Sequence, residues 1–181
     1  MAEILLTSEE FVKSISNISD NLAGKYMLPA IREAQEINLR EILGDALTDK
    51  LKEIVESGQA NNPENAVYKE LIEVSQYFLA YQTIAGLPYK VGYKIGNIGV
   101  AKTSDTNVQG STLAEISNIQ NYYQNKADFY AAKIQRFALE HYSQLPELTQ
   151  NDCYHIRKTL HSSATCSIWL GGARGKIYGK K

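Results

Sequence analysis

The sequence predicts a mainly α protein. It would form a helical bundle with a long C-terminal helix, an extended β-hairpin-like arm between its two longest helices, and an extended C-terminal tail. Apolar residues recur at helical spacing through residues 31–87 and again through 113–137. Between these regions, a glycine-punctuated stretch alternates apolar and polar residues as strands do. The last eleven residues contain four glycines and no helical pattern.

The charge is distributed unevenly along an otherwise ordinary globular composition. Of 181 residues, 44% are hydrophobic and 22% are charged, which suits one domain with a buried core. Residues 1–152 contain 13 basic and 20 acidic side chains, a net charge of −7, whereas six basic residues and no acid follow Asp152. The sequence therefore predicts an acidic body and a basic tail.

The ends and the cysteines indicate where the chain is made. Its apolar runs are too short to span a bilayer, and the opening MAEILLTSEE has acids where a signal peptide carries basic residues. We therefore expect synthesis in the cytoplasm and no membrane partner. In that compartment Cys153 and Cys166 are expected to be reduced thiols.

Two helices are predicted in the N-terminal part. Thr7 and Glu10 have the spacing of a capping box, which would begin a short helix ending near Ile18. A polar stretch with little periodicity follows as far as Met27. Pro29 is then expected in the first turn of the second helix.

Glycine and proline divide the helical pattern that follows. Gly44 and Asp45 interrupt it and predict a break, with Asp45 as a cap for the next helix. Asn62 and Pro63 are typical of a helix start, so a helix is expected over residues 63–87. Its apolar residues cover more than one face, which indicates a central helix, and Pro88 is expected to end it.

A second long helix is predicted near the C-terminal end of the body. Thr112 and Glu115 form another capping box, and helical spacing continues to about Tyr142. Such a helix would be roughly 45 Å long. Because the body does not require that length, part of this helix is expected to pack against another molecule.

The predicted arm spans residues 89–111. Apolar positions alternate with Lys and Gly from Tyr89 to Ile95, and Gly96 with Asn97 supplies a turn. An isolated two-stranded ribbon is marginally stable in water, so the arm should lie on its own helices or on a neighbouring subunit. The candidate interface residues of the arm are Tyr93, Ile95, Ile98 and Val100.

No catalytic or cofactor motif is complete, so no enzyme and no cofactor are predicted. Residues 171–176 are similar to a phosphate-binding loop but lack one residue of spacing and the following Ser or Thr. Four residues of the tail have side chains that can bind zinc, although their spacing matches no common finger. They are Cys153, His155, His161 and Cys166.

The order of these features resembles the head-to-tail connector, or adaptor and neck-ring, proteins of tailed bacteriophages and prophages. The resemblance covers about residues 28–148, and its motifs are short, so it depends on their order. The matching pieces are Ile31-Arg-Glu-Ala-Gln35, Leu39-Arg-Glu-Ile-Leu-Gly44, a helix closing at Pro88, Asn97-Ile-Gly-Val100, and Leu113 to Tyr142.

The resemblance implies a structural virion protein that forms a homo-oligomeric ring, usually a dodecamer, in the neck between the portal and the tail. DNA would pass through the ring without sequence-specific contact, and the partners would be the portal protein and tail or further neck proteins. Residues 1–148 would form the helical connector domain with the inserted arm, which would contact an adjacent subunit. Residues 149–181 would form a short helix and a docking tail.

The resemblance also suggests that the tail binds the portal. Three apolar residues would provide the anchor, with basic residues meeting acids and an aromatic residue beside them. The candidate docking residues are Ile168, Trp169, Leu170, Arg174, Lys176 and Tyr178.

Two other functions remain open from the residues alone. A small nucleic-acid-binding protein would use the basic tail on phosphates, with Tyr178 stacking on a base, although the acidic body disfavours this as the main role. An enzyme that uses the Cys and His residues of the tail would need an orienting group and an oxyanion site, which the sequence does not identify.

Overall fold

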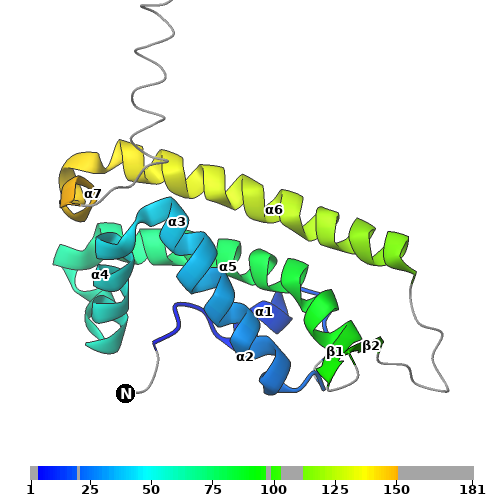
Figure 1. The fold of residues 1–181 in the computed structure, drawn as a ribbon. Coiled ribbons are helices and arrows are strands. Elements are labelled where there is room, and N and C mark those ends of the chain that lie inside the picture. The colour runs from blue at the N-terminus through cyan, green and yellow to red at the C-terminus, as the bar shows by residue number, and fades with distance from the viewer. Residues whose placement is uncertain (1–3, 20, 97–98, 103–111, 151–181) are drawn as a thin grey trace, which may run out of the picture.

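The computed structural model describes residues 4–19, 21–96, 99–102 and 112–150, and they are mainly helical (Figure 1). The prediction of a mainly α protein is therefore confirmed. The elements in chain order are α1 (Glu9–Ser14), α2 (Gly24–Glu33), the π-helical segment η1 (Ala34–Leu39), α3 (Arg40–Leu43), α4 (Asp45–Glu56), the 3₁₀ turns η2 (Gln59–Asn61) and η3 (Pro63–Asn65), α5 (Ala66–Gly92), β1 (Tyr93–Gly96), β2 (Gly99–Lys102), α6 (Leu113–Glu140), the 3₁₀ turn η4 (Tyr142–Gln144) and α7 (Glu147–Gln150).

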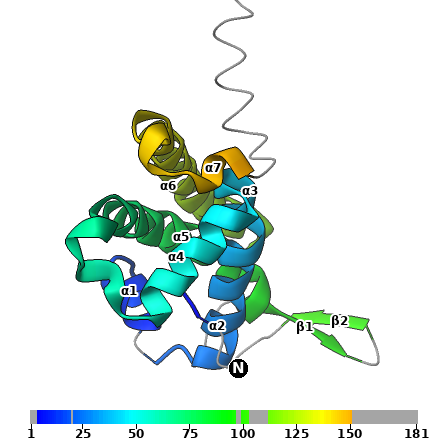
Figure 2. The same cartoon turned by 90° about the vertical axis from the view of Figure 1, so that its left-hand side faces the viewer.

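The two long helices α5 and α6 run antiparallel along the molecule, and α2, η1 and α3 cross α5 (Figure 1). The helices α4 and α7 lie at one end of this body, and the two strands lie at the other. The strands extend away from the helices (Figure 2). No helix among the described residues is both long and apolar enough to cross a membrane.

Helix α5 is central, as its apolar residues on several faces predicted. Leu71 and Leu79 are fully buried in the main core, which α3, α4, α6 and α7 complete. Ala80 and Ile84 lie in a second core with Val12 of α1 and residues of α2. These two cores place α5 between two layers of helices, so its burial stabilises the whole body.

The N-terminal segment is attached to η1 by a buried amide. Gln35 is fully buried, and its Oε1 accepts a hydrogen bond from the Leu6 amide at 2.8 Å. Its Nε2 donates to the Ile4 carbonyl at 3.0 Å. A buried amide that satisfies both its donor and its acceptor in this way orders the chain ahead of α1.

The predicted start of α1 is wrong by one residue. Ser8, not Thr7, is the N-cap, and its Oγ accepts from the Phe11 amide at 3.2 Å. Thr7 is instead buried, and the helix ends at Ser14 rather than near Ile18. The sequence offers two adjacent hydroxyl residues as caps, and only the path of the preceding segment selects between them.

Helix α2 begins earlier than predicted. It starts at Gly24, so Pro29 lies inside the helix rather than in its first turn. A proline there removes one backbone hydrogen bond, but its fixed φ is compatible with a helix. Burial of Met27 and Ile31 in the second core offsets the lost bond.

The predicted break at Gly44 is confirmed. Helix α3 ends at Leu43, and Gly44 has φ of 81° and ψ of 167°. This region of backbone conformation strongly favours glycine. Asp45 begins α4 as its first residue rather than capping it, and Thr48 Oγ1 donates to the Gly44 carbonyl at 2.8 Å.

The predicted end of α5 at Pro88 is wrong, whereas the predicted start is present as a 3₁₀ turn with Asn62 as N-cap and Pro63 in its first turn. The 3₁₀ turn η3 occupies residues 63–65, and the α-helix starts at Ala66. Pro88 does not end the helix, which continues to Gly92. The arm therefore does not begin at Tyr89. Residues 89–92 instead form the last turn of α5. A proline inside a helix removes one backbone hydrogen bond, and the helix can continue beyond it.

The predicted second capping box is confirmed at the start of α6. Oγ1 of Thr112 accepts from the Glu115 amide at 3.3 Å, and a Glu115 carboxylate oxygen accepts from the Thr112 amide at 2.7 Å. The helix ends at Glu140, close to the predicted end at Tyr142. Its 28 residues correspond to roughly 42 Å.

Candidate functional site

The described residues form no recognisable catalytic or metal centre. Among them, no group of three or more His, Cys, Asp or Glu side chains lies close enough together to hold a metal ion. The ring of His141 stacks on Phe137, with centroids 4.2 Å apart, and its Nδ1 lies 3.1 Å from the Phe137 carbonyl. The four tail residues considered as zinc ligands, Cys153, His155, His161 and Cys166, lie outside the described residues.

Three of the four candidate arm residues lie in the strands. Tyr93 and Ile95 belong to β1, Val100 belongs to β2, and Ile98 lies outside the described residues. The strands are antiparallel, with Ile95 opposite Val100 and Tyr93 opposite Lys102. A two-stranded sheet has two edges whose backbone groups can pair with another strand.

The candidate docking residues of the tail lie outside the described part of the chain. They are Ile168, Trp169, Leu170, Arg174, Lys176 and Tyr178.

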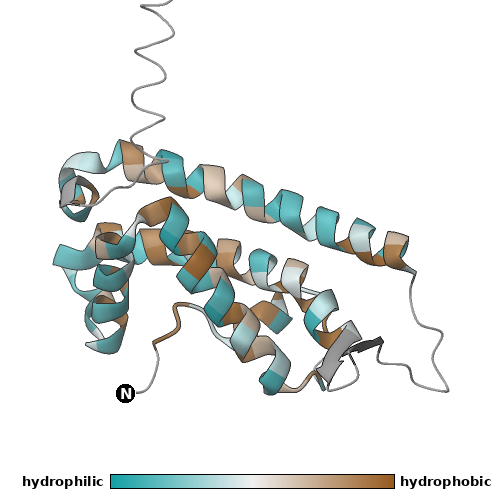
Figure 3. Ribbon diagram, viewed as in Figure 1, coloured by the Kyte–Doolittle hydropathy of each residue, from teal (hydrophilic) through white to brown (hydrophobic). Residues whose placement is uncertain are grey.

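Helix α6 carries large apolar side chains that the rest of the described chain leaves exposed. The exposed fractions are 66% for Leu113, 47% for Ile119, 56% for Tyr122 and 66% for Phe129. The end of α6 nearest the strands shows this apolar character (Figure 3). Exposed apolar side chains are typical of protein interfaces where they form a contiguous patch, whereas single ones are ordinary.

The exposed side chain of Phe129 lies away from the face of α6 that contacts the core. The buried residues Ala127, Ile134 and Phe137 define the face of α6 that contacts the core. Phe129 follows Ala127 by two positions, which turns it by about 200° to the other side of the helix. The apolar spacing in the sequence predicts Leu113 on the same buried face as Ile134 and Phe137. In the structure Leu113 is exposed, because no other described element packs against it at the start of α6.

An open apolar groove lies between the hairpin end of α5 and the first half of α6. It has a volume of about 650 Å³. The α5 wall consists of Ile84, Leu87, Pro88 and Val91, the α6 wall of Asn118, Ile119, Tyr122 and Tyr123, and the loop between α1 and α2 contributes Asn17, Ile18 and Leu22. None of these side chains is charged. No local pattern in the sequence predicts the groove, because it forms only where three separate segments meet.

A cluster of aromatic rings connects α1, α5 and α6 next to this groove. Tyr77 stacks on Tyr130 with centroids 5.2 Å apart, and its ring meets the edge of Phe11 at the same distance. Tyr81 lies between Tyr130 and Tyr123, at 5.6 and 6.4 Å. Ring pairs at these distances contribute beyond their buried area. The cluster therefore holds the α6 wall of the groove against α5.

A lysine lies over the outer part of this cluster. The Lys126 ammonium is 4.3 Å from the centroid of Tyr122 and 5.2 Å from that of Tyr81. Its interaction with Tyr122 raises the pKa of Lys126. A cation over aromatic faces stabilises both the charge and the ring positions.

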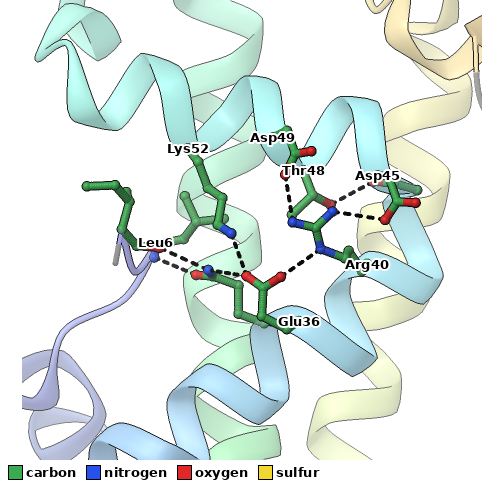
Figure 4. A network of polar contacts seen from close by, with 10 residues as sticks. Leu6, Glu36, Arg40, Asp45, Thr48, Asp49 and Lys52 are labelled. Carbon is green, nitrogen blue, oxygen red and sulfur yellow. Dashed lines mark hydrogen bonds and ion pairs between the residues drawn. The ribbon is translucent and has the colours of Figure 1, made fainter. Parts of the chain in front are cut away.

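A network of charged side chains joins η1 to α4 on another part of the body (Figure 4). Arg40 donates to Glu36 at 2.8 Å, to Asp45 at 2.9 Å and to Asp49 at 2.6 Å. Lys52 donates to the second oxygen of Glu36 at 2.5 Å. Arg40 and Lys52 thus each pair with at least one carboxylate. These bonds hold α3 and α4 in a fixed orientation on either side of Gly44.

The pKa of Glu36 reflects this network. Burial alone raises it, but hydrogen bonds from Lys52, Gln35 and Arg40 outweigh burial and hold the pKa at about 2. Hydrogen bonds to Asp49, Asp45 and Glu36 likewise outweigh burial and raise the pKa of Arg40. The network keeps its charges at neutral pH, which suits a structural role rather than proton transfer.

The comparisons with known proteins give one match. The sequence model of DUF6712, described as a family of unknown function, matches residues 39–158. The matched range runs from the end of η1 through both long helices. No curated protein and no solved structure matches significantly.

Proposed function

Because this chain belongs to DUF6712, a family of unknown function, its role has to be argued from its own residues, and we propose that it is a structural subunit of a ring. Specifically, it would be the neck ring that joins the portal to the tail in a tailed bacteriophage or prophage virion. The DNA would pass through the centre of this ring. Twelve copies of the 20.2 kDa chain would give a ring of about 240 kDa.

The observation that carries the proposal is the β1–β2 hairpin that follows α5 and extends away from the helical body (Figure 2). An isolated two-stranded ribbon is marginally stable in water and presents free edges. In a ring, an adjacent subunit would cover that edge by strand pairing or by packing. The hairpin is thus an assembly arm in this proposal, with Tyr93, Ile95, Ile98 and Val100 in the subunit contact.

Two further features support a structural role in an assembly. The side chains of Leu113 and Phe129 are each 66% exposed on α6. Covering such residues by a neighbouring subunit would contribute favourable hydrophobic free energy. The order of motifs that resembles the connector proteins covers about residues 28–148, which include this part of α6.

The tail completes the proposal at the portal. Ile168, Trp169 and Leu170 would anchor on the portal, where Arg174 and Lys176 would meet acidic residues. The portal would thereby hold the ring at the head, while tail or further neck proteins would bind its other face.

The test is the mass of the purified protein by mass photometry, alone and with the portal protein of the same phage genome. We expect a ring-sized species, at least in the presence of the portal protein, and Val100→Asp should reduce it while leaving the thermal unfolding of the subunit nearly unchanged. Ala66→Asp is the matched control, because Ala66 is exposed in the first turn of α5, where an acid is well tolerated. A strict monomer that does not bind the portal would falsify the proposal.

The alternative is a small nucleic-acid-binding protein, and the six basic residues that follow Asp152 favour it. It predicts salt-sensitive binding of short DNA that is lost when residues 171–181 are deleted. Filter binding at two salt concentrations distinguishes it from the ring, because the ring needs no DNA to form.

A further inference from the structure

The apolar groove between α5 and α6 is open and incompletely filled by its own subunit. Ile119 and Tyr122, on its α6 wall, keep 47% and 56% of their surface exposed. Ile84 and Leu87, on its α5 wall, are almost completely buried. A volume of about 650 Å³ is within the range of sites that take one large ligand group. The uncharged lining selects an apolar occupant.

The chain contains such a group outside its described residues. Trp169 is the only tryptophan, and Ile168 and Leu170 flank it. A tryptophan contributes a large apolar surface and one N–H donor. The groove walls match this chemistry, since they combine aliphatic side chains with Tyr122 and Tyr123 and the amides of Asn17 and Asn118.

The length of the tail allows this group to reach the groove. The described chain ends at Gln150 in α7, at the far end of α6 from the strands (Figure 1). From Glu140 back to Tyr122, α6 spans about 27 Å at its standard rise. The 19 residues from Gln150 to Trp169 can extend about 63 Å. The chain therefore suffices even if its path is indirect.

The charges around the groove are of both signs, because the Lys126 ammonium lies 4.3 Å from the centroid of Tyr122 on the α6 wall. Six basic residues and no acid follow Asp152, and they include Arg174 and Lys176 just beyond Trp169. Two acids lie near segments that line the groove, although neither lines it, and the Glu115 carboxylate accepts from the Thr112 amide. Glu115 precedes Ile119 by one helical turn, and the Glu9 carboxylate lies so close to Gly24, near Leu22, that a Cβ there would be 2.6 Å from it.

We propose that Ile168, Trp169 and Leu170 of the tail occupy this groove of the same chain in the free subunit, with Trp169 between the α5 and α6 walls. The tail covers Ile119 and Tyr122 there, and its basic residues lie near Glu115 and Glu9. This inference does not depend on the ring. If the ring proposal is correct, the portal has to compete with the groove for the same three residues.

The fluorescence of the single tryptophan tests this directly in the full-length monomer. We expect wild-type emission to be blue-shifted and protected from acrylamide quenching. Ile119→Asp should shift the emission to the red and remove the protection, because it places a charge in the α6 wall. Leu28→Asp is the matched control, since Leu28 is 45% exposed on α2 and does not line the groove. It should leave the emission unchanged.

A second variant distinguishes loss of tail binding from a folding defect caused by Ile119→Asp. Arg174→Glu lies in the tail and leaves the groove intact, so it should shift the emission in the same direction by a smaller amount. Far-UV circular dichroism should be unchanged in all three variants. Emission typical of free tryptophan in the wild type overturns the proposal. A blue-shifted emission that neither Ile119→Asp nor Arg174→Glu changes also overturns it. An emission that reddens on dilution assigns the tail to a second copy and also overturns it.

The outcome is separable from that of the ring. The emission reports the groove in monomers, whereas mass photometry with Val100→Asp reports the arm.

Discussion

The ammonium of Lys52 in α4 donates a hydrogen bond to Oε1 of Glu36 in η1 at 2.5 Å. The other oxygen of Glu36 accepts from Arg40 at 2.8 Å. One carboxylate therefore joins the segments on both sides of the Gly44 break. Because the side chain of Glu36 is 30% exposed, this contact is partly screened by solvent, and its contribution to stability is moderate.

Replacement of this carboxylate should weaken the fold and flatten its acid response. Glu36→Gln is expected to lower the free energy of unfolding at neutral pH by about 1 to 2 kcal/mol. The pKa of Glu36 is lowered from 4.5 to about 2 in the folded state, so the unfolded chain binds the proton more tightly. This part of the stability is full above about pH 4.5 and is lost as the pH falls toward 2.

Urea unfolding followed by circular dichroism across this acid range measures the effect. Glu64→Gln is the control, because Glu64 is an exposed carboxylate in η3, outside this network. An acid response of Glu36→Gln as steep as that of the wild type would show that the Lys52 contact does not stabilise the fold.

A tyrosine should make α7 sensitive to high pH. The Tyr68 hydroxyl lies 3.0 and 3.1 Å from the two carboxylate oxygens of Glu147, and it donates to that carboxylate. Burial and this hydrogen bond raise the pKa of Tyr68 to about 12 from 10. The stability that they contribute is present below about pH 10 and is lost as the pH rises through 12.

Tyr68→Phe is therefore expected to cost about 1 kcal/mol at neutral pH. It should also remove part of the alkaline loss of stability. Hydrogen exchange of the Leu145 and Leu148 amides, which donate to the carbonyls of Tyr142 and Leu145, measures whether this end of the body opens more often. Tyr142→Phe, at an exposed tyrosine near the same end, should change neither quantity. Equal exchange in wild type and Tyr68→Phe would contradict the assignment.

Two glycines should respond to alanine in opposite directions. Gly44 has φ of 81° and ψ of 167°, so Gly44→Ala is expected to destabilise the protein by about 1 to 3 kcal/mol. Gly86 lies inside α5, and an added Cβ there meets nothing within 4 Å. Gly86→Ala should stabilise by about 0.5 to 1 kcal/mol. Thermal unfolding of both variants is the measurement, and a shift of the same sign in both would be inconsistent with this account.

The capping box of α6 should be worth about 1 kcal/mol. Thr112→Ala removes the oxygen that accepts from the Glu115 amide. Thr112→Ser keeps that oxygen and should retain most of the stability. Ser117→Ala, at an exposed position further along the helix, serves as the control. Loss of the same free energy in the Ala and Ser variants at residue 112 would mean that the methyl group of Thr112 matters, not its cap.

The sequence by itself determined the features that depend on local chemistry. The mainly α class followed from apolar spacing. The break at Gly44 followed from a residue that alone tolerates that backbone conformation, and the start of α6 followed from a side chain that caps the helix within three residues. Each of these depends on atoms close together in the chain, so no knowledge of the partner elements was needed.

Only the tertiary structure decided where α5 ends and which side chains remain exposed. Pro88 reads as a helix end, yet α5 continues to Gly92. Pro88 lacks the N–H that would donate to the preceding turn, and the burial of Leu87 offsets this lost hydrogen bond. The groove and the exposed side chains of Ile119 and Tyr122 depend on how α6 rotates against α5. That rotation is set by the packing of many distant residues, which no local pattern records.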